Sequence, residues 1–423
     1  NRVSWFSGTI NPPKGSKING TNKHMGGPTL DNRDSVGCER TDSGKPFSCV
    51  PLRWKTVPEY LQEAGISWRV YQDKDNFGDD PLVMWKQYQT SAKKKGDLAQ
   101  RGTSFPGLQK FFDDARDGKL PEVSYIVAPM QLSEHPPYMP MDGAWIQGEV
   151  AKAVMHGKNW DSTALIYSYD ETGGWADHVV SPYPPQSEES EWIEDPYDKS
   201  NGITPIGPGF RLPFYIVSPW TSGGHVFTEH AAHESQIMFL EQWALAHGKP
   251  FTSEEIPTWR REQLSDLVKA FDFSSKDTRV PEVPHVRKPS QDIFTGHFNG
   301  ADVCQAIHLK KVQPDIPYKK LNPSNSMEVN KGFKRLRGDI TEGRRLTFEA
   351  HNRALSHSGS KLKSSSSSKE HDQKDQLFVV HWQGVNPKDN RFRIATTDQL
   401  YITKSLSLSK NEEKAALFSL KDM

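Results

Sequence analysis

The stretch TALIYSYDE, residues 163–171, places an apolar run immediately before two adjacent acids. Residues 163–169 are rich in aliphatic and aromatic side chains, which predicts a buried strand. In open α/β sheets, ligands bind beyond the carboxyl ends of the strands. We therefore expect Asp170 and Glu171 to lie at the ligand-binding edge of a sheet.

Strand-like and helix-like segments alternate on both sides of this stretch, from residue 52 to about residue 272. This alternation predicts an α/β fold with a mainly parallel sheet flanked by helices. Pro58 marks a helix start, and several glycines mark helix ends. The expected strands are 66–71, 123–127, 163–169 and 212–217, and the expected helices are 58–64, 108–116, 142–156 and 234–246.

The composition is that of a globular chain. The 423 residues are 35% hydrophobic, include 12 Trp, and carry 53 Lys and Arg against 53 Asp and Glu. This content supports a sizeable core, which excludes wholesale disorder. No apolar run approaches the roughly 18–20 residues that span a bilayer. Three cysteines exclude a disulfide scaffold, although Cys38 and Cys49 can form one bridge in an oxidising compartment.

Charge and composition change along the chain. Residues 301–423 contain 22 Lys and Arg against 14 Asp and Glu, a surplus of +8 that residues 1–300 balance. We expect a large domain over 1–273, a linker over 274–330 and a small β domain over 331–423, with a mobile Ser/Lys-rich loop at 356–375. Segregation of solvated charges explains the asymmetry most simply. The alternative is that the basic domain contacts an anionic lipid surface.

The two acids after the 163–169 strand are the first candidate for chemistry. Adjacent carboxylates raise each other's pKa unless a positive group lies nearby, and a divalent cation supplies that charge. Gly173 and Gly174 leave room for a ligand. The alternative is an acidic turn that is merely solvated. From the spacing alone, this alternative and the cation site have about equal weight.

Histidines form the second set of candidates. His135 follows the 123–127 strand and is suited to contact a phosphoryl oxygen, bind metal or transfer a proton, although a loop histidine before two prolines is more often held by backbone bonds. His233 begins an apolar helix, where it can cap the helix or reach the sheet edge. Asp177 and His178 are candidates for orienting the ligands.

Three separated motifs carry a specific resemblance. They are DExGGxxDHV at 170–179, SEHP at 133–136 and GxGFRLPxxIVSPW at 207–220. Together they resemble the phosphoesterase family of bacterial and fungal phospholipases C, plant non-specific phospholipases C and related acid phosphatases, over about residues 1–273. The basic β domain is similar to the C-terminal extension of phosphocholine-preferring phospholipases C.

The resemblance implies a fold like that of the alkaline phosphatase superfamily and a divalent-cation cofactor. It implies that Asp170 and Glu171 are metal ligands and that His135 contacts the phosphoryl group. Asn1 matches the asparagine of a Thr-x-x-Asn-Arg motif whose threonine is the nucleophile. His233 matches a family histidine, although its neighbours differ from the usual pattern.

The expected activity is that of a phospholipase C acting through a phosphothreonine, with a phospholipid or phosphoester substrate, secretion from the cell and no nucleic-acid partner. The aromatic residues Trp145, Tyr138 and Trp175 are candidates for receiving the lipid, although such residues more often belong to a core. The nucleophile would lie three residues before Asn1. We therefore expect the chain to be part of a longer protein and residues 1–423 alone to be inactive. The alternatives are an acid phosphatase of the same family and a catalytically inactive protein that binds lipid or another surface.

Overall fold

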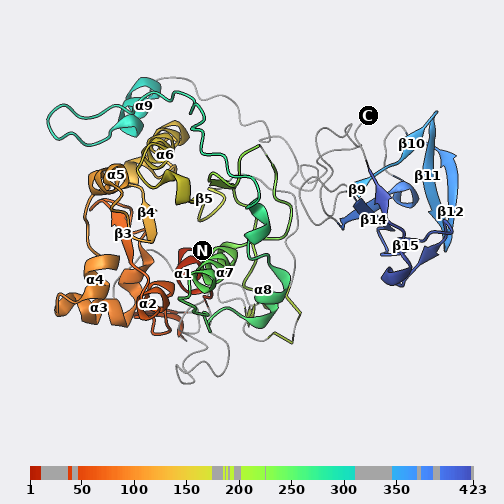
Figure 1. Ribbon diagram of the computed structural model, residues 1–423, viewed down its shortest axis with the longest axis horizontal. Coiled ribbons are helices and arrows are strands. Elements are labelled where there is room, and N and C mark those ends of the chain that lie inside the picture. Colours follow the sequence, from red (N-terminus) through yellow and green to blue (C-terminus); the bar gives the residue numbers. More distant parts are fainter. Residues whose placement is uncertain are drawn as a thin grey trace. The chain divides into compact units, whose positions relative to one another are not determined.

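The protein is described by a computed structural model in which the following residues are placed: 1–10, 37–40, 46–173, 184–185, 187–188, 191–194, 202–223, 225–309, 345–368, 373–383 and 391–420. The chain forms two compact units (Figure 1). Unit 1 comprises Asn1–Gly224 and His230–Lys310, and unit 2 comprises His225–Glu229 and Lys311–Met423. Within the described residues, no helix has the length and apolar character needed to cross a membrane.

Unit 1 mixes helices and short strands. Its helices are α1 (Arg2–Ser7), α2 (Val57–Glu63), α3 (Lys86–Lys93), α4 (Asp97–Gly102), α5 (Leu108–Asp117), α6 (Pro140–Met155), α7 (His233–Ala246), α8 (Thr258–Gln263) and α9 (Gly300–His308). Its strands are β1 (Gly37–Arg40), β2 (Pro46–Val50), β3 (Trp68–Gln72), β4 (Val123–Val127), β5 (Leu165–Ser168), β6 (Trp192–Glu194), β7 (Ile203–Pro205) and β8 (Phe214–Val217).

Local sequence signals fix several helix boundaries. Thr56 and Glu59 form a capping box at the start of α2. Gly118 ends α5 in the left-handed conformation, with φ 70°. One expected boundary is wrong: α6 begins at Pro140, so Asp142 lies in its first turn instead of capping it. Proline is favoured at the first position of a helix because the backbone N–H there has no partner within the helix. The lack of an N–H in proline therefore costs no hydrogen bond.

The strands of unit 1 form a mixed α/β arrangement. β3 and β4 pair in parallel, from Trp68 opposite Val123 to Gln72 opposite Val127. β5 and β8, in contrast, pair antiparallel, with Leu165 opposite Val217. Among the described strands these pairs are separate two-stranded sheets, so the structure supports the α/β class and one parallel pair of the expected sheet.

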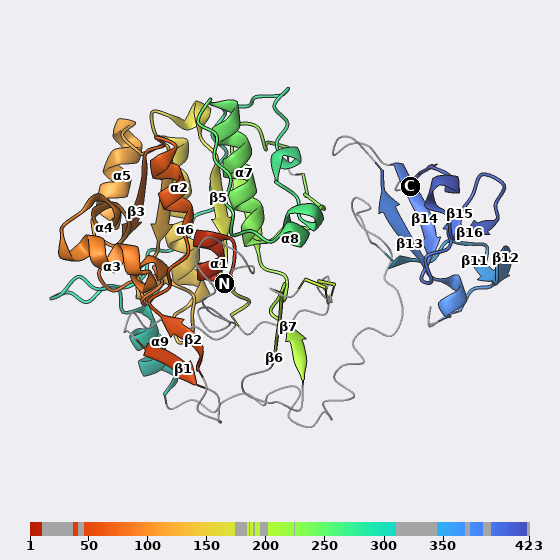
Figure 2. The ribbon, with the colours of Figure 1, turned by 90° about the horizontal axis from the view of Figure 1, so that it is seen from below.

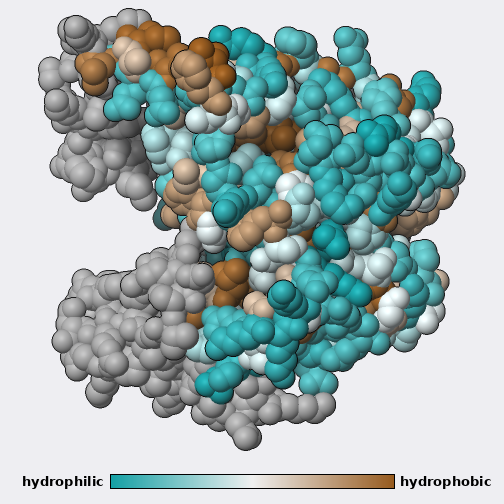
Figure 3. Space-filling model, turned by 90° about the vertical axis from the view of Figure 1, so that its left-hand side faces the viewer, coloured by the Kyte–Doolittle hydropathy of each residue, from teal (hydrophilic) through white to brown (hydrophobic). Residues whose placement is uncertain are grey.

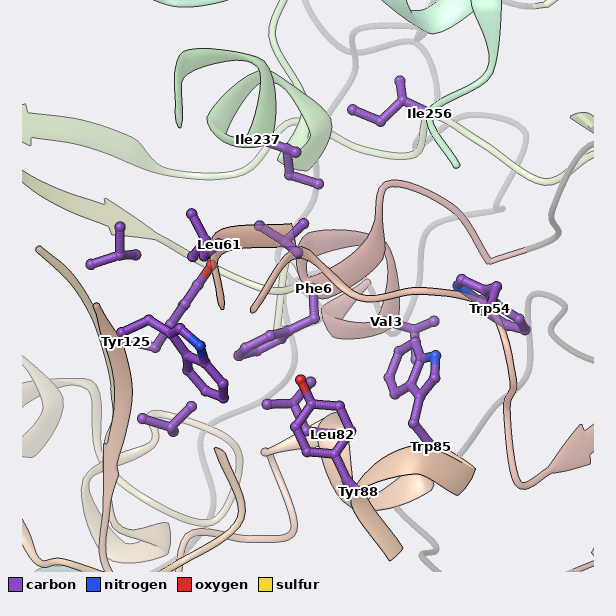
Figure 4. Packing of buried hydrophobic residues seen from close by; sticks show 14 of the residues in the cluster. Val3, Phe6, Trp54, Leu61, Leu82, Trp85, Tyr88, Tyr125, Ile237 and Ile256 are labelled. Atoms are coloured by element: carbon purple, nitrogen blue, oxygen red, sulfur yellow. The ribbon is translucent and has the colours of Figure 1, made fainter. Parts of the chain in front are cut away.

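The main core of unit 1 is centred on α1. Val3 and Phe6 are 5% and 0% exposed, and Figure 4 shows Phe6 in the middle of the cluster that includes Tyr125, Leu82 and Ile237. This cluster joins α1 to β4, α7 and the segments around α2 and α3. Since complete burial of a Phe side chain contributes roughly 1.5–3 kcal/mol, α1 is firmly held and fixes the residues at its start.

A second apolar cluster packs α5 and α6 beside β3, β4 and β5 (Figure 2). Ile146, Val150 and Val154 recur along one face of α6 and are buried there. This packing fixes the segment between β4 and α6, which contains His135.

Unit 2 contains small antiparallel sheets. Its strands are β9 (Arg345–Leu346), β10 (Glu349–Ala350), β11 (Arg353–Ser358), β12 (Lys361–Ser366), β13 (Phe378–Trp382), β14 (Arg391–Thr396), β15 (Tyr401–Ile402), β16 (Leu408–Ser409) and β17 (Phe418–Ser419). They form sheets in the orders β10-β11-β12 and β16-β15-β14-β13-β9, with β17 on β14. Phe378, Val380 and Phe392 lie in its separate core.

Two predictions for the second half of the chain differ from the structure. The Ser/Lys-rich loop expected at 356–375 contains β12, which pairs with β11 along its whole length. Gln376 donates to the Ser366 carbonyl at 2.9 Å and thereby supports this strand. The linker expected at 274–330 contains α9, which begins at Gly300.

Candidate active site

The start of α1 lies beside the acid that follows β5. Arg2 forms an ion pair with Asp170 and a second one, at 3.1 Å, with Asp79. Its guanidinium therefore bridges two carboxylates that are 91 positions apart in the chain. Because Val3 and Phe6 are buried, Asn1 and Arg2 are held at this place.

Asp170 and Glu171 lie just beyond β5, which ends at Ser168, one residue earlier than expected. Asp170 accepts the Glu171 backbone N–H at 2.9 Å, which fixes its carboxylate at the strand end. Its side chain is 39% exposed, and Glu171 is exposed. The acid pair thus lies at an accessible edge, with one carboxylate already neutralised by a cation.

Asp79 is a site residue that the sequence reading missed. Its pKa is raised to about 6, mainly by burial and also by the carboxylates of Asp170 and Glu171, against the opposing effect of Arg2 and His135. These influences place Asp79 in the same electrostatic environment as the predicted residues. A signal was available, because Asp79 belongs to an acid pair shortly after β3; its neighbour Asp80 points into the protein and is 3% exposed.

His135 lies after β4, where it was expected. Its Nδ1–H donates to the Pro136 carbonyl at 2.7 Å, which leaves Nε2 as the acceptor nitrogen. The ring packs against Phe77 with centroids 4.8 Å apart, and the side chain remains exposed. The imidazole is therefore oriented by protein contacts and accessible to a ligand.

Glu134 supports the turn that carries His135. Its carboxylate accepts from the Tyr169 hydroxyl at 3.0 Å and from Gln147 Nε2 at 2.8 Å. Burial raises its pKa, and these hydrogen bonds partly oppose the increase. A Cβ at Gly143 would lie 2.1 Å from Glu134 Cγ, so only glycine fits there. The network links the β4 and β5 ends through α6.

His233 is the first residue of α7 and lies on the other side of the acid pair. Its Nε2–H donates to the Tyr169 carbonyl at 3.0 Å. Burial lowers its pKa, while the carboxylates of Glu234 and Asp170 act in the opposite direction. The predicted residue therefore contacts the backbone directly before Asp170.

A buried ion-pair network lies behind His233. Arg260 binds Glu191 through two hydrogen bonds of 2.8 and 2.7 Å and Glu234 through one of 2.9 Å. The Ser4 hydroxyl donates to the same Glu234 carboxylate. This network ties α1, α7 and α8 together at the site. It could not be predicted from the sequence, because its members are far apart in the chain.

The donor chemistry of the site suits a hard divalent cation. Asp170 and Glu171 offer carboxylate oxygens, and the guanidinium bridging Asp79 and Asp170 shows that a positive charge is accommodated there. In the part of the chain that the structure describes, no group of three or more His, Cys, Asp or Glu has metal-site geometry. Two carboxylates complemented by water and a substrate phosphate are a common arrangement for Mg²⁺.

The remaining candidates have mixed outcomes. Asp177, His178 and Trp175 lie outside the described residues. Trp145 packs against Phe298, with ring centroids 5.5 Å apart, beside the α5–α6 core. Tyr138 donates its backbone N–H to the His135 carbonyl at 2.8 Å and closes that turn.

Comparisons with known proteins identify the family of the chain. The model of the phosphoesterase family matches residues 1–245. A non-hemolytic phospholipase C of Pseudomonas aeruginosa is 34% identical over 345 residues, which are 77% of this chain and 46% of that protein. A non-hemolytic phospholipase C of Burkholderia pseudomallei is 34% identical over 263 residues, 55% of this chain and 37% of the relative.

A plant relative is also similar. The non-specific phospholipase C6 of Arabidopsis thaliana is 32% identical over 253 residues, covering 53% of this chain and 46% of its own. The chain thus spans about half the length, or less, of these curated relatives. With more than half of its residues matched by the family model, the chain belongs to the phosphoesterase family.

Proposed function

We propose that the protein is a phosphoric-ester hydrolase, specifically a phospholipase C that cleaves phosphatidylcholine-like lipids to diacylglycerol and a phosphorylated headgroup. The observation that carries the proposal is the convergence of Arg2, Asp79, His135 and Asp170 from four distant segments. The names of the relatives support the choice of reaction. The full alkaline-phosphatase-like parallel sheet and secretion from the cell are part of the same proposal.

The residues have distinct roles in this proposal. Asp170 and Glu171 hold the divalent cation, which when bound offsets the negative charge of the phosphate. His135 presents Nε2 to a phosphoryl oxygen; it accepts a hydrogen bond when neutral and donates one when protonated. Asn1 and His233 border the same space. The attacking hydroxyl is that of the threonine expected ahead of Asn1.

Phosphoryl transfer is catalysed mainly by aligning the reacting groups and balancing their charge. This small set of residues is therefore enough to support the reaction. Arg2 is a further positive group at the site. Its guanidinium pairs with Asp170 and with Asp79, so it would keep a carboxylate partner if Asp170 held a divalent ion.

The decisive test uses the full-length protein with Asp170→Asn and phosphatidylcholine as the substrate. We expect a loss of about 10²-fold or more in kcat/KM, because the variant loses a charged metal ligand. Asp97→Asn, on the exposed surface of α4, is the matched control and should keep full activity. Unchanged turnover by Asp170→Asn would overturn the site assignment.

Substrate comparison separates the alternatives. A strong preference for a phosphomonoester over phosphatidylcholine would identify an acid phosphatase of the same family. No hydrolysis of either, with retained binding to lipid, would identify an inactive binding protein. Both outcomes contradict the phospholipase proposal.

A further inference from the structure

A tight turn before α9 exposes two large apolar side chains. Ile293 and Phe294 are 87% and 90% exposed, the highest values among the large apolar residues that the structure describes. The turn is nevertheless well held, since the Asp292 carboxylate accepts the N–H groups of Phe294 at 3.0 Å and Thr295 at 2.7 Å. The apolar side chains therefore point outward from a fixed backbone.

Helix α9 adds a second apolar surface. Val303 and Ile307, one turn apart, are 41% and 57% exposed, and Leu309 directly after the helix is 72% exposed. Brown side chains gather at the upper left of Figure 3, on the part of unit 1 where α9 lies in Figures 1 and 2. Exposed apolar residues gathered in two consecutive segments, the turn at 293–294 and α9, are typical of an interaction surface.

Contacts with α6 place this surface beside the candidate active site. Phe298 packs on Trp145, and a Cβ at Gly300 would lie 2.1 Å from Asp142 Oδ2. Asp142 belongs to the first turn of α6, and its neighbour Gly143 touches Glu134, the residue before His135. The start of α9 is thus connected to the catalytic turn through one turn of α6.

The charged residues near these exposed apolar side chains indicate which kind of partner the surface binds. Arg287 and Lys288 are exposed just before the turn, and the one acid within it, Asp292, is already hydrogen-bonded to the backbone and to the Thr295 hydroxyl. Apolar side chains next to exposed cations match a phospholipid surface, where acyl chains lie below negatively charged phosphates.

We propose that Ile293, Phe294, Val303, Ile307 and Leu309 form a lipid-contact surface that inserts into a phospholipid interface beside the active site. The inference deepens the proposed function and rests on it for the identity of the substrate. It places the lipid contact in unit 1, whereas the alternative raised by the charge asymmetry of the sequence was a contact through the basic domain at the end of the chain.

The test compares a double variant, Ile293→Ser with Phe294→Ser, with the unchanged full-length protein. Co-sedimentation uses phosphatidylcholine vesicles doped with anionic phosphatidylglycerol. We expect vesicle affinity to fall about tenfold or more, because two large side chains no longer leave water. Phe105→Ser, a half-exposed residue before α5, is the matched control and should bind normally.

Activity provides an independent readout. We expect the double variant to hydrolyse vesicles at least tenfold more slowly, and to hydrolyse a short-chain phosphatidylcholine, kept below its micelle-forming concentration, at the normal rate. An equal loss on both substrates would show a structural defect and overturn the proposal. Normal vesicle binding would overturn it too, including the case in which residues 311–423 cover this surface.

A parallel variant addresses the competing basic domain. Leu406→Ser removes an apolar side chain that is 65% exposed in unit 2. We expect it to leave vesicle binding unchanged. A loss confined to Leu406→Ser would assign the contact to unit 2. If no phospholipid is hydrolysed but the double variant still loses binding, the surface stands and only the proposed reaction fails.

Discussion

Arg260 is the residue on which the buried network of unit 1 depends. Glu191 and Glu234 are each 1% exposed, and both carboxylates rely on its guanidinium. Removing one partner of a buried ion pair costs about 3–5 kcal/mol, because the remaining charge loses its compensation. We expect Arg260→Met to lower the free energy of unfolding by this amount, measured by urea denaturation.

Arg116→Met provides the control for that measurement, since Arg116 pairs with Asp113 on the exposed surface of α5. Exposed pairs contribute about 0–1 kcal/mol. Similar losses in the two variants would contradict the importance of the buried network.

Asp80 gives the stability of the protein a predictable dependence on pH. Burial raises its pKa to about 7, although Leu82 and Gln72 donate hydrogen bonds to it. Between pH 4 and 7 the unfolded chain releases this proton and the folded chain keeps it, so the contribution of Asp80 to the free energy of unfolding should fall as pH rises. Asp80→Asn should show a smaller fall across this interval.

Urea midpoints at a series of pH values test this expectation. The quantity to compare is the slope of the free energy of unfolding against pH. The absolute free energy is not compared, because the substitution itself changes the interaction with Gln72. Asp97→Asn, an exposed acid, should follow the slope of the unchanged protein. Parallel profiles for Asp80→Asn would show that Asp80 does not titrate in this range.

The residues predicted from sequence were those that follow strands within recognisable motifs. His135, Asp170 and His233 lie where the motifs suggested, around one strand edge. Asp79 and Glu134 were missed as participants because burial and hydrogen bonding distinguish them from other acids, and neither property is visible in the chain. Whether the predicted residues carry the chemistry stays a prediction.

At the level of elements, the hairpin formed by β1 and β2 places two cysteines opposite each other. The antiparallel register pairs Cys38 with Cys49. Directly opposite residues in such a ladder have Cα atoms about 4.5–5.5 Å apart, within the range that a disulfide requires. We expect protein made in an oxidising compartment to contain this bond.

Peptide mapping by mass spectrometry without reduction would detect the linked pair. Cys304, a free cysteine of α9, supplies an internal control and should remain reactive to alkylation. Complete alkylation of all three cysteines in secreted protein would contradict the expectation.

Most elements of unit 1 could be predicted because periodicity, prolines and glycines act locally. β4 (Val123–Val127) and α7 (His233–Ala246) match their predicted ranges within one residue. β12 was predicted to be a loop because its Ser/Lys-rich sequence has low complexity. Pairing with β11 and the hydrogen bonds from Gln376 nevertheless hold it extended. Cross-strand contacts of this kind cannot be seen in one segment alone.

At the scale of the whole molecule, each unit has its own apolar core. Phe6 is fully buried in unit 1, and Phe378 is fully buried in unit 2. Replacement of a buried Phe by Ala costs about 3–5 kcal/mol. We expect calorimetry to show two unfolding transitions, one lowered by Phe6→Ala and the other by Phe378→Ala.

The shift should be larger for the smaller unit, because the same free energy moves the Tm of a small domain by about 4–8 °C per kcal/mol and that of a larger one by about half as much. Each variant is the control for the other, because each substitution lies in the core of only one unit. A single transition that moves in both would show that the units unfold together.

The α/β class of unit 1 and the β class of unit 2 could be read from the order of elements. Strand direction could not: β8 runs against β5, although both are short apolar runs that look alike in sequence. Direction depends on the path of the intervening chain, which carries little periodicity.

The position of α1 has a practical consequence for anyone who produces this protein. Its first residues adjoin Asp79 and Asp170, so a polyhistidine tag joined directly to Asn1, in a version of the protein shortened to begin there, would lie next to this acidic edge and compete with it for divalent ions.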